Sequence, residues 1–296
     1  MKLSMTRDQL LKPLQQVAGV VERKHTMPIL ANVLLRVTED EISFTGTDLE
    51  VELVATQKLT AEQFVQAGEI TIPCRKLLDI CKSLPVTANI ELSLDENKLL
   101  IKSGRSRFSL ATLPAQDFPS LEEDAGAFSL NISQGNLKRL IEKTAFAMAQ
   151  QDVRYYLTGM LFEVTNNQLR AVTTDGHRLA LFDAQAETVP TDKIQVIVPR
   201  KGVQELQRLL SDDDSALHLT FGNNHLQVTL PINSAKKKDE EASVEGFVSF
   251  TSKLIDGKFP DYQRVLPRGG DKIVLISHED FKQALQRASI LTNEKY

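Results

Sequence analysis

The chain has 296 residues, of which 42% are hydrophobic and 25% are charged, and 35 Lys and Arg against 39 Asp and Glu give a net charge of −4. These proportions are typical of soluble globular proteins and exclude extensive disorder, a collagen-like chain and a disulfide scaffold. At about 100–150 residues per domain, the length predicts two domains and part of a third. The net charge argues against a uniformly basic nucleic-acid coat protein, but it leaves room for a basic surface within an acidic whole.

The lack of a signal peptide and the use of cysteine indicate the same cellular compartment. The first ten residues, MKLSMTRDQL, lack the apolar run of a signal peptide, and the chain has no apolar stretch of 18 residues. Cys74 and Cys81 have no His nearby, which favours two small buried hydrophobes over a disulfide or a metal site. We therefore expect a cytoplasmic protein with no membrane segment, no metal and no cofactor.

The first predicted elements, a short strand followed by a helix, occur three times. Thr6 precedes Gln9 by three residues, which is the spacing of a capping box, and apolar residues follow at helical spacing. The same strand, cap and helix recur around Ser133 and around Ser277. In the third copy the alternating residues predict a strand over 274–276.

The segments that follow the first helix also repeat. The residues of the first copy with a counterpart 127 positions later are Leu30, Val33, Leu34, Val37, Thr38, Ile42, Thr47 and Asp48. A strand, a Pro at a helix start and an apolar stripe occur at Ile72-Pro73 and again at Val198-Pro199. Further on, the offset grows by 15 residues because of an insertion over 231–245, which carries the run KKKDEE. We interpret this insertion as a solvated hairpin loop, with a regulatory or contact loop as the alternative.

These repeats define a fold class and its domain boundaries. Each copy holds two helices and about eight strands, which predicts an α+β architecture of repeated domains with two helices packed on antiparallel sheets. We expect the first domain over 1–125, the second over 126–268 and the start of a third over 269–296. A strand and a helix alone cannot bury a core, so the third domain is expected to be incomplete.

Basic and acidic residues fall on different elements. The predicted helices carry Arg7, Lys12, Lys138, Arg139, Lys143, Lys282, Arg287, Arg75, Lys76, Lys82, Arg200, Lys201 and Arg208. The acidic residues gather in loops at 39–41, 122–124, 212–214 and 240–241. Ordinary solvent-facing helix surfaces are the alternative, but a bias shared by five helices favours contact with a phosphate backbone without base reading.

The most enzyme-like segment is 174–178, TDGHR. In a hydrolase, His177 could act as the base and Asp175 as the carboxylate that orients it. The first repeat keeps Thr47 and Asp48 but has no His, so a turn in which Asp accepts backbone N–H bonds is the simpler interpretation. A protein that holds DNA by contact alone is a further alternative.

Several motifs together resemble one family. They are 10–17 (LLKPLQQV), 28–30 (PIL), 46–50 (GTDLE), 103–110 (SGRSRFSL), 151–157 (QDVRYYL), 174–180 (TDGHRLA), 198–202 (VPRKG) and 256–262 (DGKFPDY). The chain resembles the bacterial sliding clamps, the beta subunits of DNA polymerase III. The resemblance implies the DNA-clamp fold and a head-to-tail homodimeric ring that surrounds duplex DNA and confers processivity without catalysis. The implied partners are the polymerase III alpha subunit, an ATP-driven clamp loader, and other polymerases and repair proteins that bind through a short peptide.

The resemblance also implies three sets of site residues. The DNA-facing set is Lys24, Arg75, Gln151, Arg200 and Lys201, with Arg23 or His25 as alternatives to Lys24. The cleft for partner peptides is formed by Leu157, Thr174, Gly176, His177, Arg178, Leu179, Pro260, Arg264 and Val265. The dimer interface contains Arg105, Arg107, Phe108, Leu110, Ile290 and Leu291. The alternative for Phe108 and Leu110 is the core face of their own edge strand.

Overall fold

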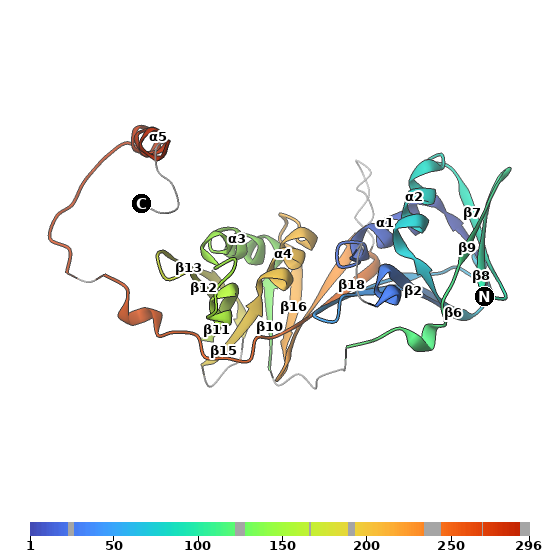
Figure 1. Cartoon of the computed structure of the whole chain (residues 1–296), viewed down its shortest axis with the longest axis horizontal. Helices are drawn as coiled ribbons and strands as arrows, with labels where there is room; N and C mark the ends of the chain where they lie inside the picture. Colours follow the sequence, from blue (N-terminus) through green and yellow to red (C-terminus); the bar gives the residue numbers. More distant parts are fainter. Residues whose placement is uncertain are drawn as a thin grey trace. The chain divides into compact units, whose positions relative to one another are not determined.

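The computed structural model describes residues 1–22, 27–121, 128–165, 167–188, 193–233, 244–267 and 269–290 (Figure 1). These residues form two compact units, Met1–Phe259 and Pro260–Tyr296. The first unit contains both complete copies of the repeat.

Four helices of the first unit come in two pairs, as the repeat predicts. The pairs are α1 (Arg7–Val17) with α2 (Cys74–Ser83), and α3 (Gln134–Glu142) with α4 (Arg200–Leu209). Thr6 and Gln9 form the predicted capping box at α1, and the Ser133 hydroxyl accepts the Asn136 N–H at α3. Pro73 and Pro199 are the N-caps of α2 and α4. The local start signals therefore determined where these helices begin.

Each complete repeat contains nine strands, one more than expected, because a short edge strand is added to each. The first repeat has β1 (Lys2–Thr6), β2 (Asn32–Val37), β3 (Glu41–Thr47), β4 (Val51–Lys58), β5 (Phe64–Gln66), β6 (Gly68–Pro73), β7 (Asn89–Asp95), β8 (Lys98–Ser103) and β9 (Ser106–Ala111). The second has β10 (Phe128–Ser133), β11 (Gly159–Thr165), β12 (Gln168–Thr174), β13 (Leu179–Gln185), β14 (Glu187–Thr188), β15 (Ile194–Pro199), β16 (Ala216–Phe221), β17 (His225–Asn233) and β18 (Val244–Lys253). Single turns of 3-10 helix lie at Pro28–Ala31, Ala115–Asp117, Ala145–Ala147 and Tyr155–Thr158.

The two repeats are joined by strand pairing. All paired strands are antiparallel and form sheets in the orders β5-β1-β7-β8-β9, β13-β12-β11-β15 and β14-β10-β16-β17-β18-β4-β3-β2-β6. In the nine-stranded sheet, β18 of the second repeat pairs with β4 of the first, from Gly246 opposite Gln57 to Ser252 opposite Val51. One sheet therefore runs through both repeats.

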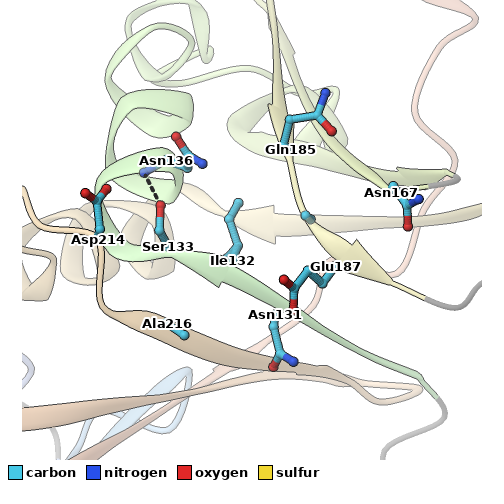
Figure 2. A pocket seen from close by; sticks show the side chains of 10 residues that line it. Asn131, Ile132, Ser133, Asn136, Asn167, Gln185, Glu187, Asp214 and Ala216 are labelled. Atoms are coloured by element: carbon cyan, nitrogen blue, oxygen red, sulfur yellow. Dashed lines mark hydrogen bonds between the residues drawn. The ribbon is translucent and has the colours of Figure 1, made fainter.

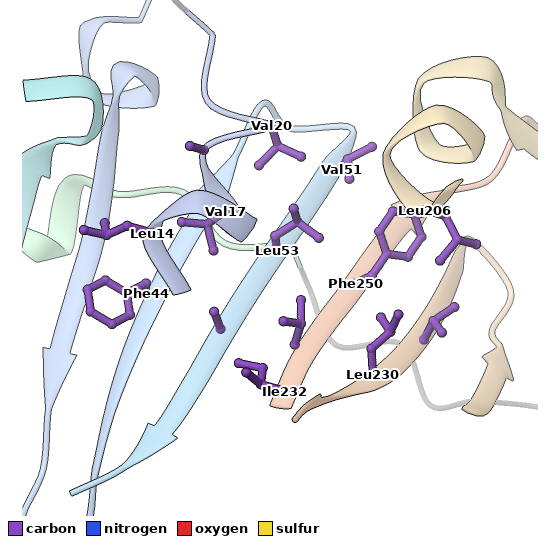
Figure 3. Close-up of a cluster of buried hydrophobic side chains, with 14 of the residues drawn as sticks. Leu14, Val17, Val20, Phe44, Val51, Leu53, Leu206, Leu230, Ile232 and Phe250 are labelled. Atoms are coloured by element: carbon purple, nitrogen blue, oxygen red, sulfur yellow. The ribbon is translucent and has the colours of Figure 1, made fainter. Parts of the chain in front are cut away.

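The hydrophobic core also continues across this junction. Figure 3 shows Leu14 and Val17 of α1 beside Phe44 and Leu53 of the first repeat, with Phe250 of β18 on the other side. All five side chains are fully buried. Burial of this kind contributes about 25 cal/mol per Å² of apolar surface, so the joined repeats stabilise one another.

The two strands that lead into and out of the insertion, β17 and β18, pair with one another. These strands pair from His225 opposite Lys253 to Asn233 opposite Val244. Residues 234–243, which carry the KKKDEE run, lie outside the described residues, so the solvated hairpin loop stays a prediction there.

The second unit contains the helix of the third copy but not its strand. The helix α5 (His278–Ser289) begins at Ser277, whose hydroxyl accepts the Asp280 N–H as predicted. The expected strand over 274–276 was wrong, because these residues pair with no other described strand and Leu275 is 95% exposed. A strand needs a partner for its backbone groups, and no described residue provides one.

Candidate functional site

The basic residues on the helices of the first unit differ in accessibility, and several are engaged by other groups of the protein. Figure 1 shows α1, α2, α3 and α4 on the same side of the nine-stranded sheet. Arg75, Lys76 and Lys82 of α2 are exposed. Arg7 is not part of this surface, because its side chain is only 15% exposed and its Nε donates to the Cys81 carbonyl at 2.9 Å. Arg208 and Lys201 are also engaged, since Arg208 Nη2 donates to the Gln16 carbonyl at 2.6 Å and Lys201 Nζ lies 2.5 Å from Glu22 Oε1.

The remaining predicted DNA contacts differ in accessibility. Arg75 and Gln151 are exposed, on α2 and in the loop before Asp152. Arg200 is half-buried at the start of α4, and its Nη1 donates to the Met148 carbonyl at 3.3 Å. Lys24, with its alternatives Arg23 and His25, lies outside the described residues.

Lys201 is engaged by two carboxylates of the first repeat. Its Nζ lies 2.5 Å from Glu22 Oε1 and also contacts the Asp48 carboxylate. Burial acts to lower the pKa of Lys201, but the bonds to Asp48 and Glu22 outweigh it and raise the pKa above its usual value. Its positive charge is therefore compensated inside the protein.

The Thr-Asp pairs of the two repeats form the same turn. Asp175 Oδ1 accepts the N–H groups of His177 and Arg178 at 2.9 and 3.0 Å, and the Thr174 hydroxyl donates to the Arg178 carbonyl at 2.7 Å. In the first repeat, Asp48 Oδ1 accepts the corresponding N–H groups of Glu50 and Val51.

These bonds contradict the hydrolase interpretation. Asp175 receives the backbone N–H of His177, and its second oxygen receives Arg178 Nε at 3.1 Å. Burial tends to raise the pKa of Asp175, and the backbone and Arg178 bonds together lower it below its usual value. The carboxylate thus holds a turn and a guanidinium, as the turn interpretation predicted.

The predicted peptide-surface residues of the first unit differ in exposure. Leu157 is buried, Thr174 and Leu179 are half-buried, and Gly176, His177 and Arg178 are exposed. Gly176 has φ +89°, a left-handed conformation that favours glycine. Pro260, Arg264 and Val265 belong to the second unit, where all three are exposed and Arg264 Nε pairs with Asp261 at 2.8 Å.

Two residues that sequence reasoning missed complete the turn. Arg178 Nη2 donates to the Phe146 carbonyl at 2.8 Å, and its guanidinium lies 5.7 Å from the centroid of the Phe146 ring. Arg154 pairs with Asp152 and donates to the Asp175 carbonyl at 3.4 Å. The QDVRYY motif contains Arg154 and could have indicated it, whereas nothing in the local sequence indicates Phe146.

The residues predicted for the dimer interface fall into two groups. Arg105 and Arg107 are exposed at the β8–β9 hairpin and Ile290 is 76% exposed, whereas Leu291 lies outside the described residues. Leu110 belongs to the core and Phe108 packs against it while half-exposed. The core-face alternative therefore describes Leu110. Phe108 fits this alternative only in part, because it packs against the core and is half-exposed.

A cavity of about 740 Å³ is lined by none of the predicted site residues (Figure 2). It is lined by Asn131, Ile132, Ser133, Asn136, Asn167, Gln185, Ala186, Glu187, Asp214 and Ala216. Within the described ranges, no three His, Cys, Asp or Glu side chains come together as a metal site. No helix in those ranges is long and apolar enough to cross a membrane.

Comparison with solved structures defines the class of protein. A crystal structure of the DNA polymerase III subunit beta from Pseudomonas aeruginosa matches with a TM-score of 0.91 and 53% identity, over 100% of this chain and 76% of that one. A sliding clamp from Bacillus subtilis matches with a TM-score of 0.87 at 27% identity, over 100% of this chain and 75% of that one. Repeated α+β domains joined sheet to sheet, with basic helices on one side, are the architecture of DNA sliding clamps, which are non-catalytic processivity factors.

Family models and curated relatives give the finer assignment. The N-terminal domain of the DNA polymerase III beta subunit matches residues 1–122, and its central domain matches 131–261. The beta sliding clamps of Pseudomonas putida and Escherichia coli K12 are 55% and 47% identical over the whole chain, which covers 76% of each of them. The chain belongs to the DNA polymerase III beta subunit family.

Proposed function

We propose that this chain acts as a sliding clamp that surrounds duplex DNA and tethers the replicative polymerase and other DNA-processing proteins to it. The observation that carries the proposal is the β18–β4 junction, in which the last strand of one repeat extends a sheet of the preceding repeat. This geometry can be repeated from domain to domain.

The same junction can form at both ends of the double repeat. The counterpart of β4 in the second repeat is β13, and the counterpart of β18 in the first repeat is β9. Both are edge strands, and no described strand pairs with their outer edges. A further repeat could therefore add its last strand to β13, and β9 could extend a sheet of a second copy. Head-to-tail contacts of this kind generate a closed ring when their rotation closes.

Binding to DNA would rest on charge and enclosure together. Arg75, Gln151, Arg200 and Lys24 are the proposed contacts with the phosphate backbone, whereas at Lys201 the ion pairs with Glu22 and Asp48 compete with such a contact. Contacts with phosphates alone give Kd values of about 10⁻⁴–10⁻⁶ M that weaken with salt. A ring retains DNA when each contact is weak, so it can slide.

The exposed turn at Gly176–Arg178, with Leu157 and Leu179, is the proposed docking place for partner peptides on the first unit. The peptide-binding role of Pro260, Arg264 and Val265 in the second unit stays a prediction. Apolar anchors with Arg at the rim suit a short linear peptide. The proposed partners are the polymerase III alpha subunit, the clamp loader, and other polymerases and repair proteins. A bound polymerase would meet the primer end at a high effective concentration. We place this activity in the cytoplasm.

Retention on circular DNA tests the proposal. The protein, expressed from its complete gene, is loaded by a clamp loader with ATP onto nicked circular DNA at a salt concentration that abolishes contact binding, and the circle is then cut once. Loss of the protein on linearisation is expected, because a ring slides off a free end. Retention unchanged by cutting would show contact binding and overturn the clamp mechanism.

A further inference from the structure

The guanidinium of Arg178 is held in one place although its side chain is 59% exposed. Its Nε donates to Asp175 Oδ2 at 3.1 Å, and its Nη2 donates to the Phe146 carbonyl at 2.8 Å. One face of the guanidinium lies over the Phe146 ring, with 5.7 Å between Cζ and the ring centroid. A planar group that is bound through two of its nitrogens and one face has little freedom left to rotate.

Phe146 is fixed by the core although its own ring is exposed. It lies on the single 3-10 turn Ala145–Ala147, and both Thr144 and Ala147 are fully buried. The Thr144 carbonyl accepts the Ala147 N–H at 3.1 Å and the hydroxyl of Thr173 at 2.5 Å. Thr173 comes directly before the exposed turn, so this hydrogen bond ties the backbone that carries Phe146 to the backbone that carries the turn.

This arrangement leaves part of the Arg178 side chain available to a ligand. An arginine side chain has five N–H donors in a fixed fork. The contacts with Asp175 and Phe146 use two of them, and within the described part of the chain the other three have no partner. Fixed N–H groups of a cation suit a carbonyl or carboxylate oxygen, and because they are already ordered, less entropy is lost on binding.

We propose that Phe146 is a positioning residue of the site for partner peptides. It holds the Arg178 guanidinium so that the free N–H groups meet a carbonyl or carboxylate oxygen of the bound peptide. The inference rests on the proposed function, because it concerns the turn that we assign to partner peptides. The Phe146 carbonyl stays in every variant, so substitution tests the role of the ring.

Binding of the purified polymerase III alpha subunit to the protein expressed from its complete gene tests this role. We expect Phe146→Leu to weaken binding about 2–5-fold, which is the range of a cation–π contact at an exposed site. Phe146→Tyr keeps an aromatic face and should restore the affinity. Phe247→Leu is the matched control, because its ring is 48% exposed and no described cation lies over it. Wild-type binding by Phe146→Leu would overturn the inference.

A double-mutant cycle separates positioning from direct contact with the peptide. If Phe146 acts through Arg178, the double variant Phe146→Leu/Arg178→Met should bind as weakly as Arg178→Met alone. Additive losses would assign Phe146 a contact of its own or a general role in folding, and either would overturn the inference. Wild-type binding by Arg178→Met would contradict the peptide site itself, and the inference with it.

The NMR signal of the Arg178 Nε–H group tests the positioning without any partner. In the wild type the Phe146 ring should shift this signal through its ring current, and the bond to Asp175 should slow its exchange with water. We expect Phe146→Leu to remove the shift and speed the exchange, and Phe146→Tyr to retain both. Exchange as slow in Phe146→Leu as in the wild type would show that the ring does not hold the guanidinium, which would overturn the inference and leave the proposed function untouched.

Discussion

Asp48 and Asp175 hold the same turn in the two repeats with different cations. Asp48 contacts Lys201 of the other repeat, and Asp175 pairs with Arg178 of its own turn. The Asp48 side chain is 2% exposed, and that of Asp175 is 23% exposed. One turn thus forms part of an interface between the repeats, and the other lies at the surface with Gly176, His177 and Arg178 exposed.

Replacing the two carboxylates should therefore have unequal effects on stability. We expect Asp48→Ala to lower the free energy of unfolding by about 3–5 kcal/mol, because Lys201 and two backbone N–H groups lose a buried partner. Asp175→Ala should cost about 1 kcal/mol, because water can replace the carboxylate there. Urea unfolding of both variants measures the difference, and equal losses would contradict the distinction.

The Asp152–Arg154 pair should be visible in a pH titration. The side-chain hydrogen bond from Arg154, followed by a backbone bond from the same residue, lowers the pKa of Asp152 from 3.8 to about 2. A lowered pKa in the folded state means that the contribution to stability is present above pH 3.8 and is lost as the pH falls towards 2. Carboxyl NMR should show the Asp152 titration at about pH 2. In Arg154→Met it should return towards 3.8, and an unchanged midpoint would rule out the pair as the cause.

The strand junction between the repeats should tolerate no side chain at Gly246. A Cβ atom there would collide with the Thr56 carbonyl of β4. We expect Gly246→Ala to lower the free energy of unfolding by about 1–3 kcal/mol, in the range of overpacked sites. Gly270→Ala is the control, since nothing lies near that position. Thermal unfolding compares the two, and an unperturbed Gly246→Ala protein would show that the junction is looser than described.

Both thiols should be unreactive in the folded protein. Burial raises the pKa of Cys74 to about 11 and that of Cys81 to about 12, with Arg75 and Arg7 opposing the shifts. The thiolate is the reactive form, so iodoacetamide at pH 8 should label neither residue until denaturant is added. Rapid labelling of the native protein would contradict this burial.

His177 should be dispensable for DNA retention. Its ring is exposed, and the neighbouring carboxylate is engaged by backbone N–H groups and Arg178. We expect His177→Ala to remain on circular DNA like the wild type while binding partner peptides more weakly. Loss of retention in this variant would instead assign His177 to the DNA surface.

Local sequence signals predicted an element well where the signal and the element lie within a few residues of each other. The capping box at Thr6, the caps at Ser133 and Ser277 and the Pro residues before α2 and α4 all begin helices where expected. The strand over 274–276 was wrong, because alternation of apolar residues describes a face and does not supply a neighbouring strand. The contact between Arg178 and Phe146 joins residues that lie 32 positions apart, and no local sequence pattern indicates such a contact.

By itself the sequence determined the repeat, the α+β class, the helix starts and the basic character of the helices, because spacing, caps and composition act over short stretches of chain. Only the tertiary structure decided which basic side chains are engaged by other groups of the protein. Arg7 and Lys201 both read as basic surface residues in the sequence, yet one donates to the Cys81 carbonyl and the other contacts Glu22 and Asp48. Those partners are far away along the chain, and strand pairing and core packing bring them close.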